Sequence, residues 1–509
     1  MLKKIRVGIA VVVLALITFF FLDFAGILPS GFNWLAKIQL VPALLSLNIL
    51  VLLALVVTTF LFGRIYCSVI CPLGIFQDLV GRISKLFRRK KKRYRYHKAQ
   101  NILRWSVLIL VVVSFLLGFN LLFGLLDPYS AYGRIVATLF KPAYLAGNNL
   151  LESIFTSFNS YTFYKMDIAI RGLFVLIVGA VTFLAVGFLA WKYGRLYCNT
   201  ICPVGTLLGF LSRFSFFKIR FDASSCNQCG LCELKCKGLC LDSKEQTIDY
   251  CRCVTCFNCM ESCRHGALKY APFTSSKKEN TIIVSEPVDD GKRKFLSTLV
   301  VTSLTIPAVY AQKKTGIASD VKPFGRNTPL TPPGSISAEN LLQHCTSCQL
   351  CISKCPTNVL KPAFLEYGLS GMMQPVMSFD KGFCNFNCTV CSNTCPNGAI
   401  KPLTVEEKHR TQVGRVVFIK ENCIVTNRER SCGACSEHCP TQAVSMVPYK
   451  GWITIPSVNP DICIGCGGCE FVCPAPEKAI YVEGNKVHQL AKIVAEEEKE
   501  EKEVDGFGF

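Results

Sequence analysis

The sequence predicts an α-helical membrane domain followed by small α+β domains built around clustered cysteines. Half of the 509 residues are hydrophobic, and long apolar segments gather in the first 200 or so positions, as expected of membrane spans. The thirty cysteines fall mostly in the remainder of the chain, in regularly spaced runs. Cysteines so numerous and so regular exceed what ordinary structural thiols require, and they predict sites for inorganic cofactors.

Four apolar segments are each long enough to cross a bilayer as a helix, because about 20 helical residues span about 30 Å of hydrocarbon. Lys3, Lys4 and Arg6 precede the first segment, and no small-residue cleavage site follows it cleanly. We therefore expect an uncleaved anchor rather than a signal peptide. The four predicted spans are Val7–Leu22, Val41–Gly63, Ile102–Gly124 and Ile168–Trp191.

The positive charges indicate which way these spans run. The formal net charge is +21, and much of it lies at the N-terminus and in the block GRISKLFRRKKKRYRYHK at positions 81–98. Basic residues beside apolar segments mark cytoplasmic loops and suit anionic lipid headgroups, which disfavours nucleic acid as the partner. Both ends of this domain are predicted to be cytoplasmic, in an inner (cytoplasmic) membrane, with loops 29–40 and 127–167 outside.

Haem is disfavoured as the cofactor of the predicted spans. None of the six histidines lies inside them, whereas a membrane cytochrome b needs axial histidine ligands there. The chain also contains no C-x-x-C-H motif for covalent c-type haem.

A twelve-residue motif occurs twice, at the cytoplasmic ends of the second and fourth predicted spans. Gly63–Gly74 reads GRIYCSVICPLG, and Gly194–Gly205 reads GRLYCNTICPVG. Such a repeat implies two similar helical hairpins related by a pseudo-two-fold axis. The axis would bring Cys67, Cys71, Cys198 and Cys202 towards one another, where they would hold a metal or a further cluster, act as two redox-active pairs, or serve only as small structural residues.

The first cysteine array predicts two [4Fe–4S] clusters in a ferredoxin-like domain. Two C-x2-C-x2-C-x3-C runs follow one another, and in two-cluster ferredoxins the fourth cysteine of each run serves the other cluster. Lys237 and Arg264 stand where proline usually follows the last cysteine. Cys240 and Cys251 are surplus, and either could substitute as a ligand. The predicted ligand sets are Cys226, Cys229, Cys232 and Cys263 for one cluster, and Cys253, Cys256, Cys259 and Cys236 for the other.

The second array predicts four more clusters by the same exchange within two pairs of runs, which makes six in total. The C-x2-C-x3-C-P elements are specific for this cofactor, whereas zinc sites use separated cysteine pairs. The four runs are Cys345, Cys348, Cys351 and Cys355; Cys384, Cys388, Cys391 and Cys395; Cys423, Cys432, Cys435 and Cys439; and Cys463, Cys466, Cys469 and Cys473.

Between the arrays lies a short apolar segment, 295–311, preceded by Lys292, Arg293 and Lys294. Basic residues on its N-terminal side predict a fifth span that exits on the outer face, although 17 residues are near the lower limit for a crossing. A buried helix or a linker is the alternative. The predicted organisation is a four-span membrane domain (1–215), a cytoplasmic two-cluster domain (216–275), a linker with the fifth span (276–333), a periplasmic four-cluster domain (334–490) and a charged tail (491–509).

These motifs resemble a known pair of proteins. Residues up to about 270 resemble the NapH-type membrane ferredoxins, with two Cys-x3-Cys-Pro motifs and a two-cluster domain. Residues from about 290 to 490 resemble the NapG/MauM-type four-cluster ferredoxins, including the run CNFNCTVCSNTCPNGAI. Lys292–Leu296 resembles the twin-arginine export signal of the latter, with lysine replacing one arginine. The resemblance implies a quinol dehydrogenase module, an oxidoreductase subunit that relays electrons from the quinone pool to a periplasmic reductase or electron carrier.

Asp127, Tyr129 and Arg134 are the candidate quinol site, because a carboxylate near a tyrosine and an arginine could take quinol protons and hold the ring. An interfacial anchor of aromatic and basic residues is the alternative. A second function comes from a resemblance to the CcoG and NosR groups, which share the Cys-x3-Cys-Pro core. It is an accessory reductase for metal-cofactor assembly, in which Cys67, Cys71, Cys198 and Cys202 handle a metal.

Overall fold

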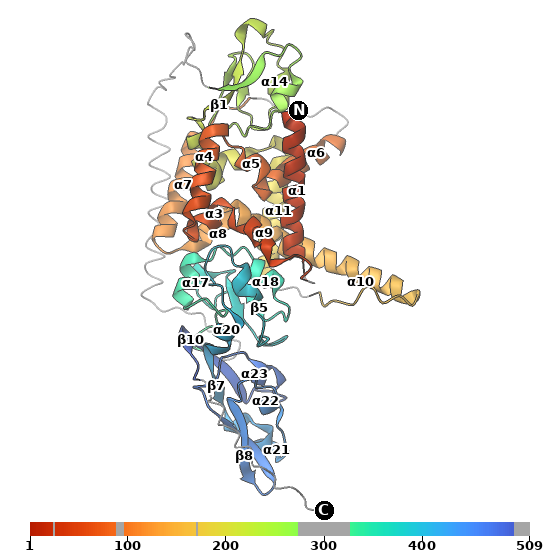
Figure 1. Ribbon diagram of the computed structural model, residues 1–509, viewed down its shortest axis with the longest axis vertical. Helices are drawn as coiled ribbons and strands as arrows, with labels where there is room; N and C mark the ends of the chain where they lie inside the picture. Colours follow the sequence, from red (N-terminus) through yellow and green to blue (C-terminus); the bar gives the residue numbers. More distant parts are fainter. Residues whose placement is uncertain (24–25, 88–95, 169–171, 273–325, 493–509) are drawn as a thin grey trace, which may run out of the picture.

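The computed structural model describes residues 1–23, 26–87, 96–168, 172–272 and 326–492. Along its long axis lie a small domain next to the N-terminus, a helical body, and a C-terminal domain that extends away from the body (Figure 1). The two cysteine arrays therefore occupy opposite ends of the helical body. The predicted fifth span at 295–311, loop residues 88–95 and nearly all of the charged tail lie outside the described residues.

Among the described residues, two helices of the body are long and apolar enough to cross a membrane, α1 (Leu2–Leu22) and α11 (Leu173–Tyr193), with 21 residues each. They correspond to the first and fourth predicted spans. The prediction of four uninterrupted spans is wrong for the second and third, each of which is broken in two. The pieces are α3 (Leu40–Leu45) and α4 (Ile49–Phe62), and α7 (Asn101–Leu116) and α8 (Asn120–Leu126).

Local backbone chemistry accounts for both breaks. Leu47 has a φ of 52°, and the Asn48 side chain accepts a hydrogen bond from the Val51 amide, which begins α4 afresh. In the third segment Gly118, at a φ of 76°, follows the end of α7, as glycine commonly does in this left-handed conformation. Hydropathy does not register such single-residue interruptions, so the sequence pattern alone suggested continuous spans.

Shorter helices complete the body. Two of them begin within each copy of the repeated motif, and others close the end of the body that faces the C-terminal domain. A helix also leaves the body sideways at that end (Figure 1). These elements are η1 (Ser30–Asn33), α2 (Trp34–Lys37), α5 (Tyr66–Val69), α6 (Pro72–Phe87), α9 (Pro128–Ile135), the π-helical turn η2 (Val136–Phe140), α10 (Lys141–Ser157), α12 (Leu196–Thr200) and α13 (Pro203–Ser212).

The length of helix α1 gives the distance between the two cysteine domains, because α1 contacts one domain near each of its ends. Near its N-terminus Lys3 forms an ion pair with Glu261 of the first domain. Near its C-terminus the Ser353 hydroxyl of the second domain donates to the Phe21 carbonyl, 2.6 Å away. At 1.5 Å per residue a helix of this length extends about 30 Å. The body thus separates the two domains by about the thickness of a bilayer's hydrocarbon core.

The first cysteine domain is a small α+β unit. Strand β1 (Phe217–Phe221) pairs antiparallel with β4 (Leu268–Pro272), so that the two ends of the domain meet and its cysteines lie between them in the chain. Ile219 of β1 is buried in a core in which half of the buried residues are cysteines. The other elements are η3 (Ala223–Ser225), α14 (Leu231–Lys235), β2 (Leu241–Asp242), β3 (Thr247–Ile248) and α15 (Asn258–Ser262).

Like the first cysteine domain, the C-terminal domain consists of two-stranded sheets and helices of one or two turns. Strand β10 (Ile480–Leu490) pairs with β7 (Thr411–Phe418), β8 (Val444–Lys450) with β9 (Ile453–Val458), and β5 (Leu360–Pro362) with β6 (Pro375–Met377). Its helices are α17 (Ala338–His344), α18 (Leu350–Lys354), η4 (Leu369–Gly371), α19 (Val390–Thr394), α20 (Val405–Arg410), η5 (Lys420–Asn422), α21 (Ile424–Arg428), α22 (Ala434–Glu437) and α23 (Gly468–Val472).

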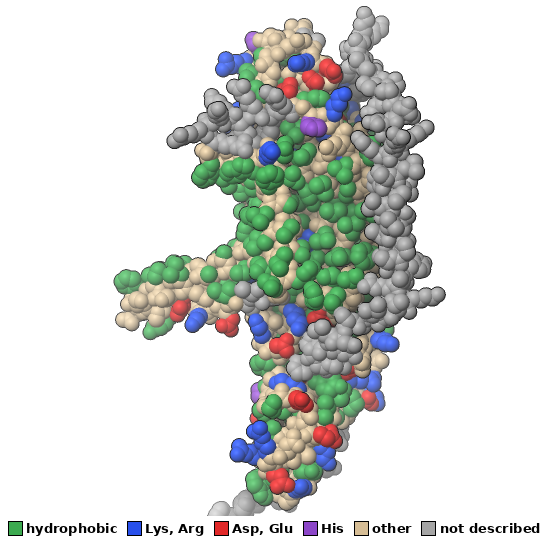
Figure 2. Space-filling model, turned by 180° about the vertical axis from the view of Figure 1, so that it is seen from behind, with side chains coloured by type: hydrophobic (Ala, Val, Ile, Leu, Met, Phe, Trp, Pro, Cys, Tyr) green, Lys and Arg blue, Asp and Glu red, His purple; other side chains and the backbone are tan. Residues whose placement is uncertain are grey.

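The surface of the molecule carries a broad apolar band around the helical body. Figure 2 shows hydrophobic side chains across the body, with charged side chains gathered beyond both of its ends. Helix α10 projects from the edge of this band, and Leu150, Leu151, Ile154 and Phe155 of α10 are exposed. Contiguous exposed apolar surface of this extent marks contact with a partner or with lipid.

Candidate cofactor sites

Four cysteines of the first domain line one cavity. Cys226, Cys229, Cys232 and the distant Cys263 surround a space of about 340 Å³. This is the set that the exchange of last cysteines predicts. Burial raises the pKa of Cys232 to about 11, so a thiolate there would need a positive partner, which a bound cluster iron supplies.

The second cavity of this domain is lined by five cysteines rather than four. Cys236, Cys253, Cys256 and Cys259 surround about 350 Å³ together with the surplus Cys240. The Sγ atoms of Cys236 and Cys240 are 3.5 Å apart. A hydrogen bond from Cys240 lowers the pKa of Cys236 to about 7, which favours the thiolate. Cys240 is therefore placed as an alternative ligand to Cys236.

Cys251, the other surplus cysteine, contacts the helical body through its backbone carbonyl. Its carbonyl accepts a hydrogen bond from Arg64 Nη1 at 2.9 Å, and Arg104 Nη2 lies 3.5 Å from the same oxygen. Cys251 thus joins the first domain to the helical body and does not line either cavity.

The cysteine runs share a local geometry that explains their spacing. In four of them a residue in the left-handed region comes directly before a five-residue helix: Gly230, Phe257, Gln349 and Gly467, with φ between 59° and 79°. The third cysteine is the second residue of that helix, and the fourth cysteine caps its C-terminal end. The short helix thereby points the third and fourth cysteines in different directions, towards two different cavities.

The C-terminal cysteines gather in the same crossed sets. Cys423, Cys432 and Cys435 line a cavity of about 360 Å³ together with Cys473 of the following run. Burial raises the pKa of Cys391, and negative charge on Cys384, Cys355 and Cys388 raises it further. In the same way, negative charge on Cys348, Cys345 and Cys395 raises the pKa of Cys351. Negative charge on Cys466, Cys463 and Cys439 raises the pKa of Cys469.

Backbone amides face several of these sulfur atoms. The Ser347 amide donates to Cys345 Sγ and the Gly465 amide to Cys463 Sγ, both at 3.4 Å. Hydrogen bonds to sulfur favour the thiolate and raise the reduction potential of a cluster. Among the described residues, no three His, Cys, Asp or Glu side chains gather closely enough for a single metal ion. Cavities lined by four thiols and flanked by amides suit a larger cluster instead.

The four cysteines of the repeated motif lie inside the helical body. Cys67, Cys71, Cys198 and Cys202 are each 3–4% exposed and belong to one buried core. The two motif copies exchange hydrogen bonds, as a pseudo-two-fold axis requires. Arg195 Nη1 donates to the Cys67 carbonyl at 2.7 Å, and Arg64 Nη2 donates to the Cys198 carbonyl at 3.3 Å. Sequence reasoning noted these arginines within the repeat but not their role.

The glycine that ends each motif copy packs against the same backbone. A Cβ on Gly74 would lie 2.3 Å from the Cys67 carbonyl oxygen, and one on Gly205 would lie 2.2 Å from that of Cys198. Only glycine permits this approach. The repeat therefore encodes a specific close-packed arrangement around the four cysteines, beyond the cysteines themselves.

A buried carboxylate ties the first domain to the body. Asp78 of α6 lies 2.9 Å from Arg195 Nε, 3.3 Å from Arg6 Nη1 and 3.2 Å from Lys237 Nζ. Lys237 is the residue that replaces the usual proline after Cys236. Its ion pair with Asp78 explains that departure, because the lysine holds the loop after Cys236 against the helical body.

The candidate quinol residues lie where the body meets the C-terminal domain, and all three are buried. Asp127 caps α9 by accepting from the Ser130 amide at 2.8 Å, and Arg134 donates to the Gly124 and Leu125 carbonyls at 2.8 and 3.0 Å. Ser130 donates to Thr346 of the C-terminal domain at 2.8 Å. Among the described residues the Tyr129 hydroxyl has no hydrogen-bond partner. Their role in quinol chemistry stays a prediction.

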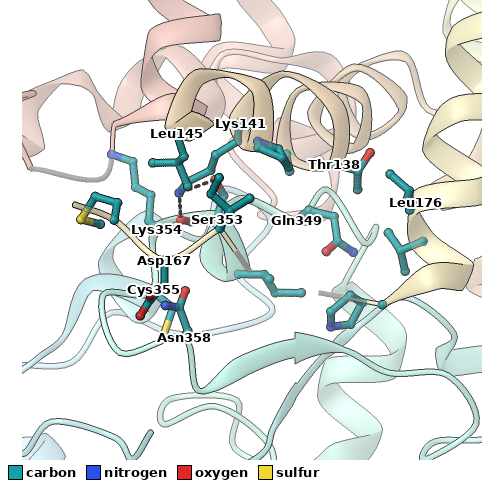
Figure 3. Close-up of a pocket in the computed structure, with 18 of the residues that line it drawn as sticks. Thr138, Lys141, Leu145, Asp167, Leu176, Gln349, Ser353, Lys354, Cys355 and Asn358 are labelled. Carbon is teal, nitrogen blue, oxygen red and sulfur yellow. Dashed lines mark hydrogen bonds between the residues drawn. The ribbon is translucent and has the colours of Figure 1, made fainter. Parts of the chain in front are cut away.

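A pocket of about 950 Å³ lies beside these residues, between the body and the C-terminal domain (Figure 3). Its walls come from the η2–α10 junction, the start of α11, residues 166–168 and helix α18. Sequence reasoning missed it, because its polar residues come from three separate parts of the chain, with Thr138 and Lys141 in one, Asp167 in another, and Gln349 inside a cysteine run where only the cysteines drew attention.

Comparison with known proteins agrees with the cysteine geometry. Residues 45–94 and 173–222 each match a family model described as a 4Fe-4S binding domain, and residues 428–476 match a 4Fe-4S dicluster domain. Both copies of the repeated motif fall inside the first of these models. No solved structure matches the chain.

Three relatives illustrate the wider similarity. The ferredoxin-type protein NapG of Escherichia coli is 31% identical over 206 residues, which cover 38% of this chain and 85% of NapG. The putative electron transport protein YccM of the same organism is 28% identical over 273 residues, 53% of this chain and 65% of YccM. The methylamine utilization ferredoxin-type protein MauM of Methylobacillus flagellatus is 29% identical over 166 residues, 32% of this chain and 70% of MauM.

Crossed cysteine sets on a scaffold of this kind define an iron–sulfur electron-transfer protein with [4Fe–4S] binding domains. Within that class, the chain belongs to the polyferredoxin family of NapG-like ferredoxin-type proteins.

Proposed function

We propose that this protein is a multi-pass membrane protein of the inner membrane that takes electrons from quinol and relays them through [4Fe–4S] clusters to an outer redox partner. The observation that carries the proposal is the placement of two cysteine domains at opposite ends of an apolar body about 30 Å long. Such a body, with α10 lying along its edge, matches a bilayer and its interface.

In this arrangement α1, α3–α4, α7–α8 and α11 cross the membrane together. Helices broken at membrane depth are tolerated where neighbouring protein covers the freed backbone groups. Lys3 and Lys4 lie at the end of α1 next to the first cysteine domain, and the preference for positive charge on the cytoplasmic side supports a cytoplasmic position for that domain. The C-terminal domain then lies on the outer face, as 295–311 would require.

The six crossed cysteine sets would hold the six clusters of the relay, two in the first domain and four in the C-terminal domain. When bound, [4Fe–4S] clusters accept and release single electrons. The chain supplies the four thiols of each set, the amides that face the sulfurs and the cavity that limits water. Stacked units of the C-terminal domain lead away from the body (Figure 1), which gives electrons an exit towards a partner.

A gap of about 30 Å between the two domains is too long for one electron-tunnelling step. Cys67, Cys71, Cys198 and Cys202 lie within that gap, and we propose that they hold a further iron–sulfur centre. Four thiolates in a buried site carry more negative charge than the iron–sulfide core of a cluster offsets. Arg64 and Arg195 are both fully buried beside them and supply compensating positive charge. Gln77 Nε2, 3.1 Å from Cys198 Sγ, would donate to that thiolate.

Replacing Cys355 with alanine is expected to stop quinol-dependent reduction of the outer partner, because Cys355 completes the set with Cys384, Cys388 and Cys391. The measurement is the rate at which a short-chain quinol reduces an artificial acceptor through the full-length protein in vesicles. Cys251→Ser serves as control, since Cys251 lines neither cavity of its domain. Undiminished electron flow in a Cys355→Ala protein that has demonstrably lost one cluster would contradict the relay.

A further inference from the structure

We propose that the 950 Å³ pocket shown in Figure 3 is the site at which quinol is bound and oxidised. This inference rests on the quinol oxidation proposed above and assigns it to particular residues. Like other small-molecule sites, the pocket combines apolar side chains with a small number of polar groups. It opens where the apolar band of the body meets the C-terminal domain, so a lipid-dissolved molecule can reach it without leaving the membrane boundary.

The lining matches the chemistry of a quinol, which is an apolar ring with two hydroxyl donors. Leu145, Leu176 and Ile352 provide apolar walls. The amide nitrogen of Gln349 donates to the Met373 carbonyl at 2.6 Å, which fixes the amide and leaves its oxygen as an acceptor. Thr138 donates to the Arg134 carbonyl at 2.7 Å, so its hydroxyl oxygen is also an acceptor.

The wall opposite α11 is held in place by a lysine. Lys141 Nζ donates to the Ser353 carbonyl and lies 3.3 Å from Ser353 Oγ, which fastens the start of α10 to α18 (Figure 3). Asp167 is exposed and also lines the pocket. It is placed to pass protons to water on the outer side.

The pocket also reaches an electron acceptor. Cys355 is one of its lining residues, and it belongs to the crossed set with Cys384, Cys388 and Cys391. Oxidation of one quinol breaks two O–H bonds and yields one quinone, two protons and two electrons. The protons would leave through Asp167 and water, and the electrons would pass one at a time to a cluster held by Cys355, Cys384, Cys388 and Cys391, which would act as the oxidant.

Access from the lipid follows from helix α11. Leu173 and Ile177 are 70% and 52% exposed and flank the pocket residues Val175 and Leu176 in sequence. By contrast, Asp127 and Arg134 are fully buried and occupied in capping α9 and in holding the Gly124 and Leu125 carbonyls. They are not lining residues of this pocket, and we assign them to the domain contact rather than to quinol chemistry.

The test fills the pocket with Leu176→Trp and uses Leu184→Trp as a matched control on the same helix, since Leu184 is 65% exposed on the apolar surface. Two readouts are taken on full-length protein in detergent: equilibrium binding of menadione to the oxidised protein, and the KM for menadiol. Overfilling a packed site commonly costs enough to weaken binding about tenfold. We expect that loss in Leu176→Trp, with cluster content and dithionite reduction unchanged, and wild-type values in Leu184→Trp.

The outcomes separate this inference from the function on which it rests. Menadione binding and menadiol KM in Leu176→Trp equal to those of wild type would overturn the pocket assignment and leave quinol oxidation standing. A wild-type protein that binds menadione in this pocket but oxidises no quinol would support the site and refute the proposed function. A wild-type protein that neither binds menadione nor oxidises menadiol would refute both.

Discussion

Replacing Asp78 with alanine is expected to destabilise the protein by about 3–5 kcal/mol, the usual cost of removing one partner from a buried ion pair. The side chain of Asp78 is 8% exposed and contacts Arg6, Arg195 and Lys237, which are 4%, 0% and 6% exposed. Without the carboxylate three buried cations face one another uncompensated. Since Lys237 belongs to the first cysteine domain, we expect that domain to dissociate from the helical body before the body and the C-terminal domain unfold.

The measurement is thermal unfolding of the purified protein in detergent, together with protease sensitivity of the first domain. Asp461→Ala is a control of the same residue change, because its ion pair with Lys492 has side chains 44% and 74% exposed; exposed pairs contribute about 0–1 kcal/mol. Adding Lys237→Met to Asp78→Ala should restore part of the loss by removing one of the stranded cations. Equal melting temperatures for Asp78→Ala and Asp461→Ala would refute this account of the domain contact.

Replacing Cys67 and Cys198 together with serine is expected to abolish electron transfer between the first cysteine domain and the C-terminal domain. Both thiols lie in the buried core between the two domains, and each belongs to one copy of the repeat. Serine oxygen is a poor ligand for iron in a cluster held by soft thiolates. The proposed intermediate centre would be lost, while all six sets in the two cysteine domains would keep their ligands.

The assay reduces the first domain with dithionite outside inverted vesicles and follows a ferric acceptor trapped inside. Iron content and the visible absorption of the clusters report whether the other centres persist. Cys240→Ser is the control for the loss of a buried thiol as such. Cys236 lines the same cavity and can serve as the ligand in its place. Transfer across the membrane at the wild-type rate in the Cys67→Ser, Cys198→Ser protein would show that the four cysteines are structural.

The cysteine pattern anticipated much of the cofactor geometry. The C-x2-C-x3-C spacing places the third cysteine inside a short helix and the fourth at its end or just beyond it, so the crossed sets follow from local structure. Cys263 and Cys473 accordingly lie with the runs that the exchange predicts. The repeat around Cys67 and Cys198 likewise predicted a paired arrangement, because two copies of one motif favour a pseudo-symmetric contact.

The sequence pattern did not predict helix breaks caused by single residues or contacts between residues far apart in the chain. The breaks at Leu47 and Gly118 depend on local backbone angles that an apolar segment does not reveal. The pairing of Asp78 with Lys237 joins residues far apart in the chain, and so does the pocket between Thr138 and Gln349. Asp127 was predicted to belong to a quinol site because it is a carboxylate; the structure shows that it caps α9, which its residue type did not reveal, and its role in quinol chemistry stays a prediction. Residue type alone does not distinguish such roles.

The central claim is that the two cysteine domains face opposite sides of a membrane, and the most direct test is the side on which the C-terminal domain lies. Two reporters would be fused after Phe509 in separate strains, one active only outside the cytoplasmic membrane and one fluorescent only inside. The account predicts that the external reporter is active and that the internal reporter does not fluoresce. Fluorescence from the internal reporter, with the external reporter inactive, would place both cysteine arrays in the cytoplasm and contradict a relay across the membrane.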